Sequence, residues 1–346
     1  MVAAAVVCVI ALTWPSVDAH KSVTSKYTYA EHVFPIVRDR CGACHFPGGP
    51  APMSLLSYKE AAPWAEAIRE QLTTAAMPPW FADPTGPAVL GGHALPARDL
   101  DVLVTWAIGG TPEGDASKAP VSSAPPLVWS AGPPDRVFDL PEVTVAAGAT
   151  EEIKAFTLPT GLQKDLWVRG VDLLPSERSM VRAVTVAVAG GPVLAAWLPG
   201  DVMMPAPSGA AFKVPAGATL QVAVRYKKNW QDTQVARTDR TRIGLYAAPA
   251  SGSALTTLAF DDSLTLKVAT RILAVRPVLT EPLAAVHVEA TLPSGDKVPL
   301  LDLRSATAGW GRRYWLTQPV DLPAGAVLAI HVSGENPSTE LLTLER

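Results

Sequence analysis

Five consecutive residues constrain this chain more than any other feature of its sequence: Cys41, Gly42, Ala43, Cys44 and His45. They match Cys-x-x-Cys-His, the attachment pattern of c-type haem. On a helical turn, two thiols at this spacing reach the two vinyl groups on one edge of a porphyrin. The imidazole that follows then lies beneath the iron as its fifth ligand. The motif therefore predicts one covalent haem c, with thioethers at Cys41 and Cys44 and with His45 on the iron.

Paired cysteines also occur in zinc sites and in redox-active dithiols. Zinc needs further Cys or His ligands nearby, and the chain has only one other cysteine, Cys8 in its first apolar stretch. A thioredoxin-like dithiol is expected in a βαβ unit, whereas residues 29–40 read as a helix that runs into the motif. Haem attachment is the favoured interpretation.

A sixth iron ligand is expected from a loop across the haem face. Met77 stands directly before Pro78 and Pro79, which would stiffen such a loop, and a methionine ligand raises the reduction potential. Met53 and His93 are competing candidates. Methionine can also simply fill a gap in a core. We predict Met77.

Helical spacing of apolar residues surrounds the motif. Residues 29–40, 57–75 and 100–108 each carry an apolar face at this spacing, and the third ends at a pair of glycines. The sequence therefore predicts a three-helix monohaem cytochrome c domain over residues 27–116.

The remaining sequence has a different character. Residues 117–136 are rich in Pro, Ala and Ser and are expected to form a linker. Short alternating strands follow, for example 184–188 and 220–226, separated by turn residues. The segments 214–220 and 322–328 both read apolar-Pro-Ala-Gly-Ala before a strand, about a hundred residues apart. We predict two antiparallel, jelly-roll-like β-sandwiches, 137–249 and 250–346, and hence a multidomain chain of α and all-β parts.

The N-terminus predicts export. Residues 2–12 form an apolar run of secretory length, and residues 17–19 resemble a small-residue cleavage site. We expect residues 1–19 to be a signal peptide, or alternatively a retained anchor, and the protein to lie in the periplasm or on the outer side of a bacterial membrane. Net charge is −3 without a basic run, which argues against nucleic acid as a partner.

Several segments together resemble a known family. They are 41–45, 51–58, 77–84, 109–115, 178–181 and 238–246. Residues 27–346 resemble bacterial proteins that fuse a cytochrome c domain to a copper type II, ascorbate-dependent monooxygenase-like module related to peptidylglycine and dopamine hydroxylases. The match is specific in the first half and extends only to the framework in the second. The resemblance implies haem in the first part and a two-copper β-module after it.

The copper ligands of that family are missing from this chain. Arg182 and Ala183 stand where the family has a His-His pair, Arg225 replaces another His, and the second site's His-x-His reads Val275 to Val278. The β part retains only His287 and His331, which we expect to be packing or surface residues. Since copper hydroxylation in such enzymes needs five His and a Met, we expect no copper and no monooxygenase activity.

Three functional hypotheses follow. The first is a monohaem electron carrier or subunit of a larger redox complex, which exchanges electrons with donor and acceptor proteins and uses its β-module for docking. The second is an oxidoreductase in which haem supplies electrons to a second site on the β-module. The third is a structural or assembly subunit stabilised by haem. We favour the first, because a haem with both axial positions filled transfers electrons and does little other chemistry.

Overall fold

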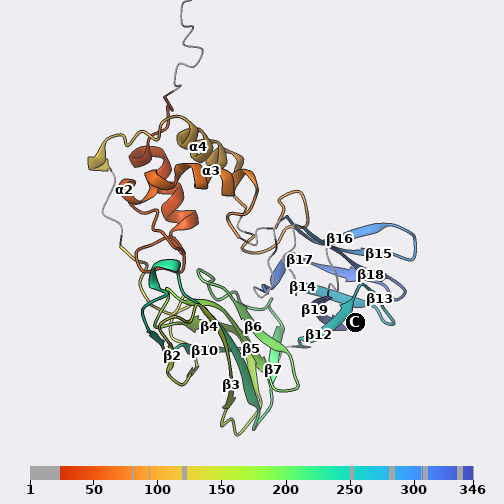
Figure 1. Ribbon diagram of the computed structural model, residues 1–346. Coiled ribbons are helices and arrows are strands. Elements are labelled where there is room, and N and C mark those ends of the chain that lie inside the picture. Colours follow the sequence, from red (N-terminus) through yellow and green to blue (C-terminus); the bar gives the residue numbers. More distant parts are fainter. Residues whose placement is uncertain are drawn as a thin grey trace, which may run out of the picture.

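The computed structural model describes residues 24–79, 82–92, 94–118, 123–249, 253–279, 285–304, 306, 311–332 and 338–345. A helical region stands on a larger β-region (Figure 1). Among the described residues, strands account for 40% and helices for 16%. The predicted signal segment 1–19 and the alternative ligand His93 lie outside the described residues.

The helical region consists of short segments. They are η1 (Tyr29–Val33), α1 (Phe34–Ile36), η2 (Val37–Cys41), α2 (Tyr58–Ala61), η3 (Ala62–Trp64), α3 (Ala65–Thr73), α4 (Ala97–Ile108) and η4 (Ala116–Lys118). Their core contains the buried side chains Tyr29, Val33, Phe34, Leu55, Leu103 and Trp106. Cys41 packs against this core, so the attachment motif lies at its edge.

The prediction of a three-helix cytochrome c domain was wrong. The expected helix 29–40 consists of π-helical η1 and η2 with the three-residue α1 between them, and the expected helix 57–75 divides into α2, η3 and α3. Prolines lie at both interruptions, Pro35 in α1 and Pro63 in η3. A proline has no N–H to donate to the helix and its ring displaces the preceding turn. Apolar spacing predicted helical character but not these interruptions.

Nineteen strands are found in the described part of the β-region. They are β1 (Arg136–Asp139), β2 (Val143–Val145), β3 (Glu151–Pro159), β4 (Leu166–Leu174), β5 (Val181–Val188), β6 (Val193–Trp197), β7 (Ala210–Val214), β8 (Thr219–Lys227), β9 (Arg237–Asp239), β10 (Arg242–Ala247), β11 (Ser253–Ala254), β12 (Thr256–Asp261), β13 (Ser263–Thr265), β14 (Thr270–Val278), β15 (Val286–Thr291), β16 (Lys297–Leu303), β17 (Tyr314–Leu322), β18 (Val327–Val332) and β19 (Ser338–Glu345). One 3-10 turn, η5 (Trp230–Asp232), follows β8.

The strands form two sandwich-like units. The first β-unit contains the sheets β1-β10-β4-β7-β11 and β3-β8-β5-β6 together with the pair β2-β9. The second β-unit contains β12-β19-β14-β17 and β13-β18-β15-β16. Nearly all pairings are antiparallel; β11 joins β7 in parallel. In β5 and β8 burial alternates along the strand, because one face of each packs on the opposite sheet.

The two Pro-Ala-Gly segments occupy equivalent places in the two units. In the first, Pro215 to Gly217 connect β7 to β8, and in the second, Pro323 to Gly325 connect β17 to β18. Each turn carries the chain from one sheet of its unit to the other, and each glycine has a positive φ, 68° at Gly217 and 86° at Gly325. That conformation favours glycine over other residues. The sequence similarity therefore reflects the same turn in both units.

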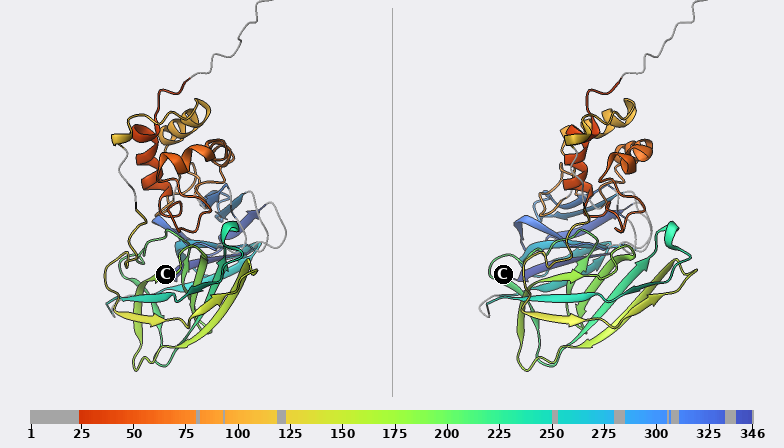
Figure 2. Two further views of the ribbon diagram at one scale, coloured as in Figure 1. Left: turned by 60° about the vertical axis from the view of Figure 1, so that its left-hand side comes forward. Right: turned by 90° about the vertical axis from the view of Figure 1, so that its left-hand side faces the viewer.

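The two β-units share apolar contacts. The core of the first includes Leu273, Trp315 and Leu342, which come from β14, β17 and β19 of the second. The sheets therefore lie against one another, as both views of Figure 2 show. Such a continuous apolar contact favours a fixed arrangement of the units.

A segment of the helical region is anchored on the second β-unit. We call residues 82–90 the strap. Ala82 pairs with Leu303 and Val89 with Leu316 in isolated β-bridges, and the N–H of Leu90 donates to the carbonyl of Trp315 at 2.8 Å. The strap follows Met77 closely in sequence, so it limits where that loop can lie. Among the described residues, no helix is both long and apolar enough to cross a membrane.

Candidate functional site

The motif Cys41–His45 forms one compact turn at the end of η2. The N–H groups of Cys44 and His45 both donate to the carbonyl of Cys41, at 3.0 and 2.9 Å. Gly42 follows η2 in helical conformation, and a Cβ there would lie 2.5 Å from the carbonyl oxygen of Arg38, so this position needs glycine. Neither Cys41 nor Cys44 is in a disulfide. Both sulfurs thus remain on one turn beside the imidazole.

The His45 ring is oriented by a backbone carbonyl. Its Nδ1 lies 3.2 Å from the oxygen of Met53, a contact that the Nδ1–H tautomer makes as a hydrogen bond. In that tautomer, Nε2 keeps the lone pair that an iron ligand needs. Burial lowers the pKa of His45, which favours the neutral ring. The orientation and protonation of this histidine therefore fit an axial ligand.

Burial also sets the protonation of the two thiols. It raises the pKa of Cys41 to about 12, and it raises that of Cys44 to about 11. In the absence of a bound group, this favours the neutral thiol form of both cysteines.

The motif docks directly on the first β-unit. Cys44 Sγ lies 3.3 Å from the carbonyl oxygen of Pro199, to which it donates. At the next residue, Gly200, a Cβ would lie 2.9 Å from the Cβ of Ala43. Since β6 ends at Trp197, the loop that follows this strand covers the Cys44 side of the motif. The guanidinium of Arg178 lies 4.4 Å from the ring centroid of Phe46, just after the motif.

The loop that follows His45 is held by amides of the first β-unit. Asn229 Nδ2 donates to the carbonyls of Gly49 and Ala51 at 3.4 and 3.3 Å, and Gln231 Nε2 donates to that of Pro52 at 2.9 Å. We call residues 49–53 the carbonyl loop. Its last carbonyl, that of Met53, is the one that orients His45. A chain of contacts therefore connects the first β-unit to the imidazole.

Arg182 fixes the amide of Asn229. Its Nη2 donates to Asn229 Oδ1 at 2.9 Å and its Nη1 to the carbonyl of Ser179 at 2.7 Å. Because Oδ1 accepts from Arg182, the Nδ2 of Asn229 must face the carbonyl loop. Burial lowers the pKa of Arg182 to about 10, which leaves it charged at neutral pH.

Two further arginines that the sequence analysis singled out form ion pairs. Arg225 pairs with Glu151 at 2.5 Å, and Arg276 pairs with Glu340 at 2.5 Å. No group of three or more His, Cys, Asp or Glu side chains in the described part of the chain is arranged to hold a metal ion. His287 and His331 stack with ring centroids 5.8 Å apart, and both contact Glu289.

The methionine candidates lie in different surroundings. Met53 packs partly against the helical core beside Cys41, and its carbonyl contacts the Nδ1 side of His45. This is the side of the imidazole that faces away from an iron bound at Nε2. Met77 follows α3, is 38% exposed, and donates its N–H to the carbonyl of Gln71. These contacts place the Met53 backbone and not a thioether sulfur at the imidazole, so Met77 stays a prediction for the sixth ligand.

Sequence reasoning singled out Arg182 only as a missing histidine, and it did not find Asn229, Gln231 or Pro199. They lie more than 150 residues from the motif in sequence and belong to no local pattern. The sequence marks Gln231 only as one of several polar residues that follow β8, and this pattern does not indicate a contact with the motif.

Comparisons with known proteins do not assign a family. No family model matches the chain, and no curated protein matches its sequence. Among solved structures, a turret protein of Sulfolobus turreted icosahedral virus aligns with 61% of this chain and 99% of its own, at 9% identity and a TM-score of 0.17. The major capsid protein of bacteriophage PM2 covers 60% of this chain and 96% of its own, at 14% identity and a TM-score of 0.26. A CBM22 tandem domain of Paenibacillus barcinonensis Xyn10C covers 59% and 93%, at 9% identity and a TM-score of 0.19. Such low TM-scores carry no argument about function.

Proposed function

We propose that this protein is a monohaem c-type cytochrome that transfers electrons outside the cytoplasm, with haem bound covalently to Cys41 and Cys44. His45 is the fifth iron ligand and Met77 the sixth. The donor and acceptor are redox proteins, and the carrier acts alone or as a subunit of a larger redox complex. The observation that carries this proposal is the His45 ring, held through Nδ1 by the Met53 carbonyl beside two unpaired thiols on the same turn.

The residues of the site fit the cofactor. Two buried thiols, a neutral imidazole and an apolar core next to Cys41 are the donor set and surroundings that c-type haem requires. A haem held there would supply one iron that accepts and releases a single electron. Among the described residues, no group of three or more His, Cys, Asp or Glu side chains is arranged to hold a second metal ion that could take the electron within this chain.

The first β-unit has a defined part in the proposal. Pro199 and Gly200 cover Cys44 and exclude water from that side, while Asn229 and Gln231 fix the carbonyl loop and thereby the imidazole. A ligand that is held rigidly needs little rearrangement when the charge at the iron changes. In this proposal the first β-unit supports the carbonyl loop, instead of holding copper as the family resemblance would imply.

The monooxygenase alternative receives no support from specific contacts. Of the positions that the resemblance assigns to histidines, Arg182 and Arg225 are engaged in hydrogen bonds or ion pairs and Ala183 has no ligand atom. In the stretch from Val275 to Val278 that corresponds to the second site, Arg276 pairs with Glu340. We therefore propose that the β-units are a copper-free docking and support module.

A redox titration of the full chain, produced with the haem-attachment machinery of an exporting host, tests electron transfer. We expect one reversible one-electron transition and rapid reduction or oxidation by a small partner cytochrome. Stoichiometric copper in the purified protein, or a haem that binds external ligands at once and does not exchange electrons, would refute the carrier. Cell fractionation tests export, and we expect the protein in the periplasm or on the outer side of the membrane. The N-terminal sequence of the purified protein then tells whether residues 1–19 are removed or retained as an anchor.

A further inference from the structure

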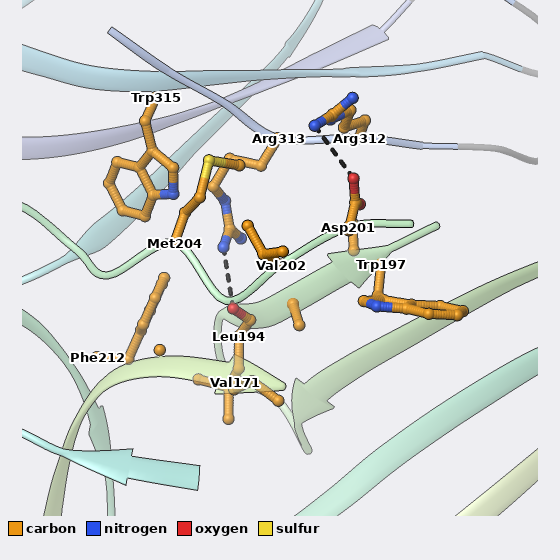
Figure 3. A pocket seen from close by; sticks show the side chains of 13 residues that line it. Val171, Leu194, Trp197, Asp201, Val202, Met204, Phe212, Arg312, Arg313 and Trp315 are labelled. Carbon is orange, nitrogen blue, oxygen red and sulfur yellow. Dashed lines mark hydrogen bonds and ion pairs between the residues drawn. The ribbon is translucent and has the colours of Figure 1, made fainter. Parts of the chain in front are cut away.

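A pocket of about 50 Å³ lies between the two β-units, behind the loop that covers Cys44 (Figure 3). Its walls combine apolar and polar side chains. The apolar ones include Val171, Leu194, Phe212 and Trp315, and the polar ones are Trp197, Asp201, Arg312 and Arg313. Proposed electron transfer uses none of these side chains, so the polar ones need an explanation of their own.

The pocket carries one uncompensated positive charge. Arg312 Nη2 lies 3.1 Å from Asp201 Oδ1, so these two charges offset one another. Arg313 donates to the carbonyls of Val193 and Leu194, and no carboxylate in the described part of the chain pairs with it. Burial lowers the pKa of Arg313 to about 9, but the side chain is still a cation at neutral pH. A buried cation without a partner anion is strongly unfavourable.

Aromatic rings hold the Arg313 guanidinium in place. It lies 5.1 Å from the ring centroid of Phe212 and 5.7 Å from that of Trp315. Cation–π contacts of this kind position a guanidinium and stabilise it partly, but they do not neutralise its charge or satisfy its N–H groups.

Two buried N–H donors at the pocket have no acceptor among the residues that the structure describes. They are Arg313 Nε and Trp197 Nε1. Both residues line the pocket, Arg313 directly before β17 of the second β-unit and Trp197 at the end of β6 of the first (Figure 3). Buried donors are nearly always satisfied by protein, water or ligand. Two unsatisfied donors beside an unpaired cation point to an acceptor that bears a negative charge.

Pocket size and access limit what that acceptor can be. One water molecule needs roughly 10–15 Å³ of such volume, so the pocket holds about three or four groups of that size. Val202 lines the pocket and is 61% exposed, so the pocket reaches the surface at this residue. A ligand with more than about four heavy atoms, or with two negative charges, fits neither the volume nor the single unpaired cation.

We propose that this pocket binds one small monovalent anion, of the size of chloride, formate or acetate, through Arg313 and Trp197. The anion completes the charge balance between the two β-units. The proposal does not depend on haem, since neither residue belongs to the motif or to the carbonyl loop.

Calorimetric titration of the full chain with sodium formate tests the site, with acetate and chloride as further probes. Sulfate, which is divalent and larger, keeps the ionic strength constant. We expect saturable binding at one site. The limit on binding free energy per ligand atom places the Kd for formate near 1 mM or weaker. Chloride should compete with formate for the same site.

Two substitutions decide whether the named donors bind the anion. Trp197→Phe removes Nε1 with little change of shape, and Arg313→Lys keeps the charge but removes Nε. Each should weaken formate binding about tenfold or more, since a hydrogen bond to a charged group is lost. Trp230→Phe is the matched control, because Trp230 lies on η5, is 67% exposed and should leave binding unchanged.

The result is decisive in either direction. If no anion gives saturable heat, or if Trp197→Phe binds formate as tightly as the unchanged chain, the pocket holds water only and the proposal fails. Should Arg313→Lys not fold, as judged by circular dichroism, the comparison of Trp197→Phe with Trp230→Phe still gives the answer.

Discussion

His45 Nδ1 lies 3.2 Å from the carbonyl oxygen of Met53, eight residues later in the chain. This contact closes the carbonyl loop, whose preceding carbonyls accept from Asn229 and Gln231 of the first β-unit. The orientation of the imidazole therefore depends on side chains nearly two hundred residues away. Four predictions and a final test follow from this arrangement.

Asn229→Ala should destabilise the protein and disturb the site. It removes the donor to the carbonyl loop and leaves the Nη2 of Arg182, which is 5% exposed, without its acceptor. An unsatisfied buried donor costs about 1–3 kcal/mol, so urea unfolding should show a loss in that range. The reduction potential should shift as well, because the imidazole is held less firmly. Gln163→Ala, an exposed residue that bonds only within its own turn, is the control and should change neither quantity.

Gly200→Ala should loosen the contact between the motif and the first β-unit. Gly200 has a φ of 86°, and an added Cβ would lie 2.9 Å from that of Ala43. Gly190 also has a positive φ, 68°, but a Cβ there meets nothing within 4 Å. Gly190→Ala therefore carries the backbone strain alone, about 1 kcal/mol. The difference in unfolding free energy between the two variants measures the contact. We expect Gly200→Ala to be worse by roughly 1–3 kcal/mol, and equal losses would contradict the docking.

The ion pair between Asp83 and Arg304 should make the strap sensitive to acid. The hydrogen bond from Arg304, with those from Thr85, lowers the pKa of Asp83 from 3.8 to about 2. A carboxyl whose pKa is lowered by folding stabilises the protein above its ordinary pKa, and that stabilisation is lost as pH falls through the folded value. Because Arg304 is 58% exposed, the effect should be at most about 1 kcal/mol.

Arg304→Ala checks this sign. Its stability deficit relative to the unchanged chain should be full at pH 6, smaller at pH 3 and mostly lost near pH 2, where Asp83 becomes protonated in the folded state. Arg136→Ala, an exposed arginine that donates only to the neighbouring carbonyl, should show a deficit near zero at every pH. A deficit for Arg304→Ala that grows on acidification would have the wrong sign for this pair.

Met77→Ala should lower the reduction potential, because loss of a thioether ligand removes its preference for reduced iron. Met53→Leu, which removes a sulfur beside the proximal carbonyl, should leave the potential nearly unchanged. The visible spectrum should likewise lose its methionine-ligand signature only in Met77→Ala. The reverse pattern would assign the sixth position to Met53.

Sequence patterns predicted local features better than their assembly. The segments 184–188 and 220–226 lie within β5 and β8, because alternation of Val and polar residues directly reflects one buried face. The helical region was predicted less well. Pro63 leaves the spacing of the apolar residues unchanged, but it removes a backbone hydrogen bond and so interrupts the helix.

The candidate site divides in the same way. The Cys-x-x-Cys-His pattern is local, so Cys41, Cys44 and His45 could be chosen from sequence. Contacts of Asn229 with Gly49 and of Cys44 with Pro199 depend on how the first β-unit packs on the helical region. A single sequence contains no local signal for such packing. The same holds for Arg313, whose missing partner becomes evident only in three dimensions.

The mass of the purified chain under denaturing conditions tests the central claim most directly. We predict an increase equal to one haem, retained after unfolding, with peroxidase staining on a denaturing gel. Replacing both thiols, as in Cys41→Ala combined with Cys44→Ala, should abolish the increase, and His45→Ala should leave the thioethers possible but alter the spectrum. An unmodified mass in a host that attaches haem c to a control cytochrome would contradict the account.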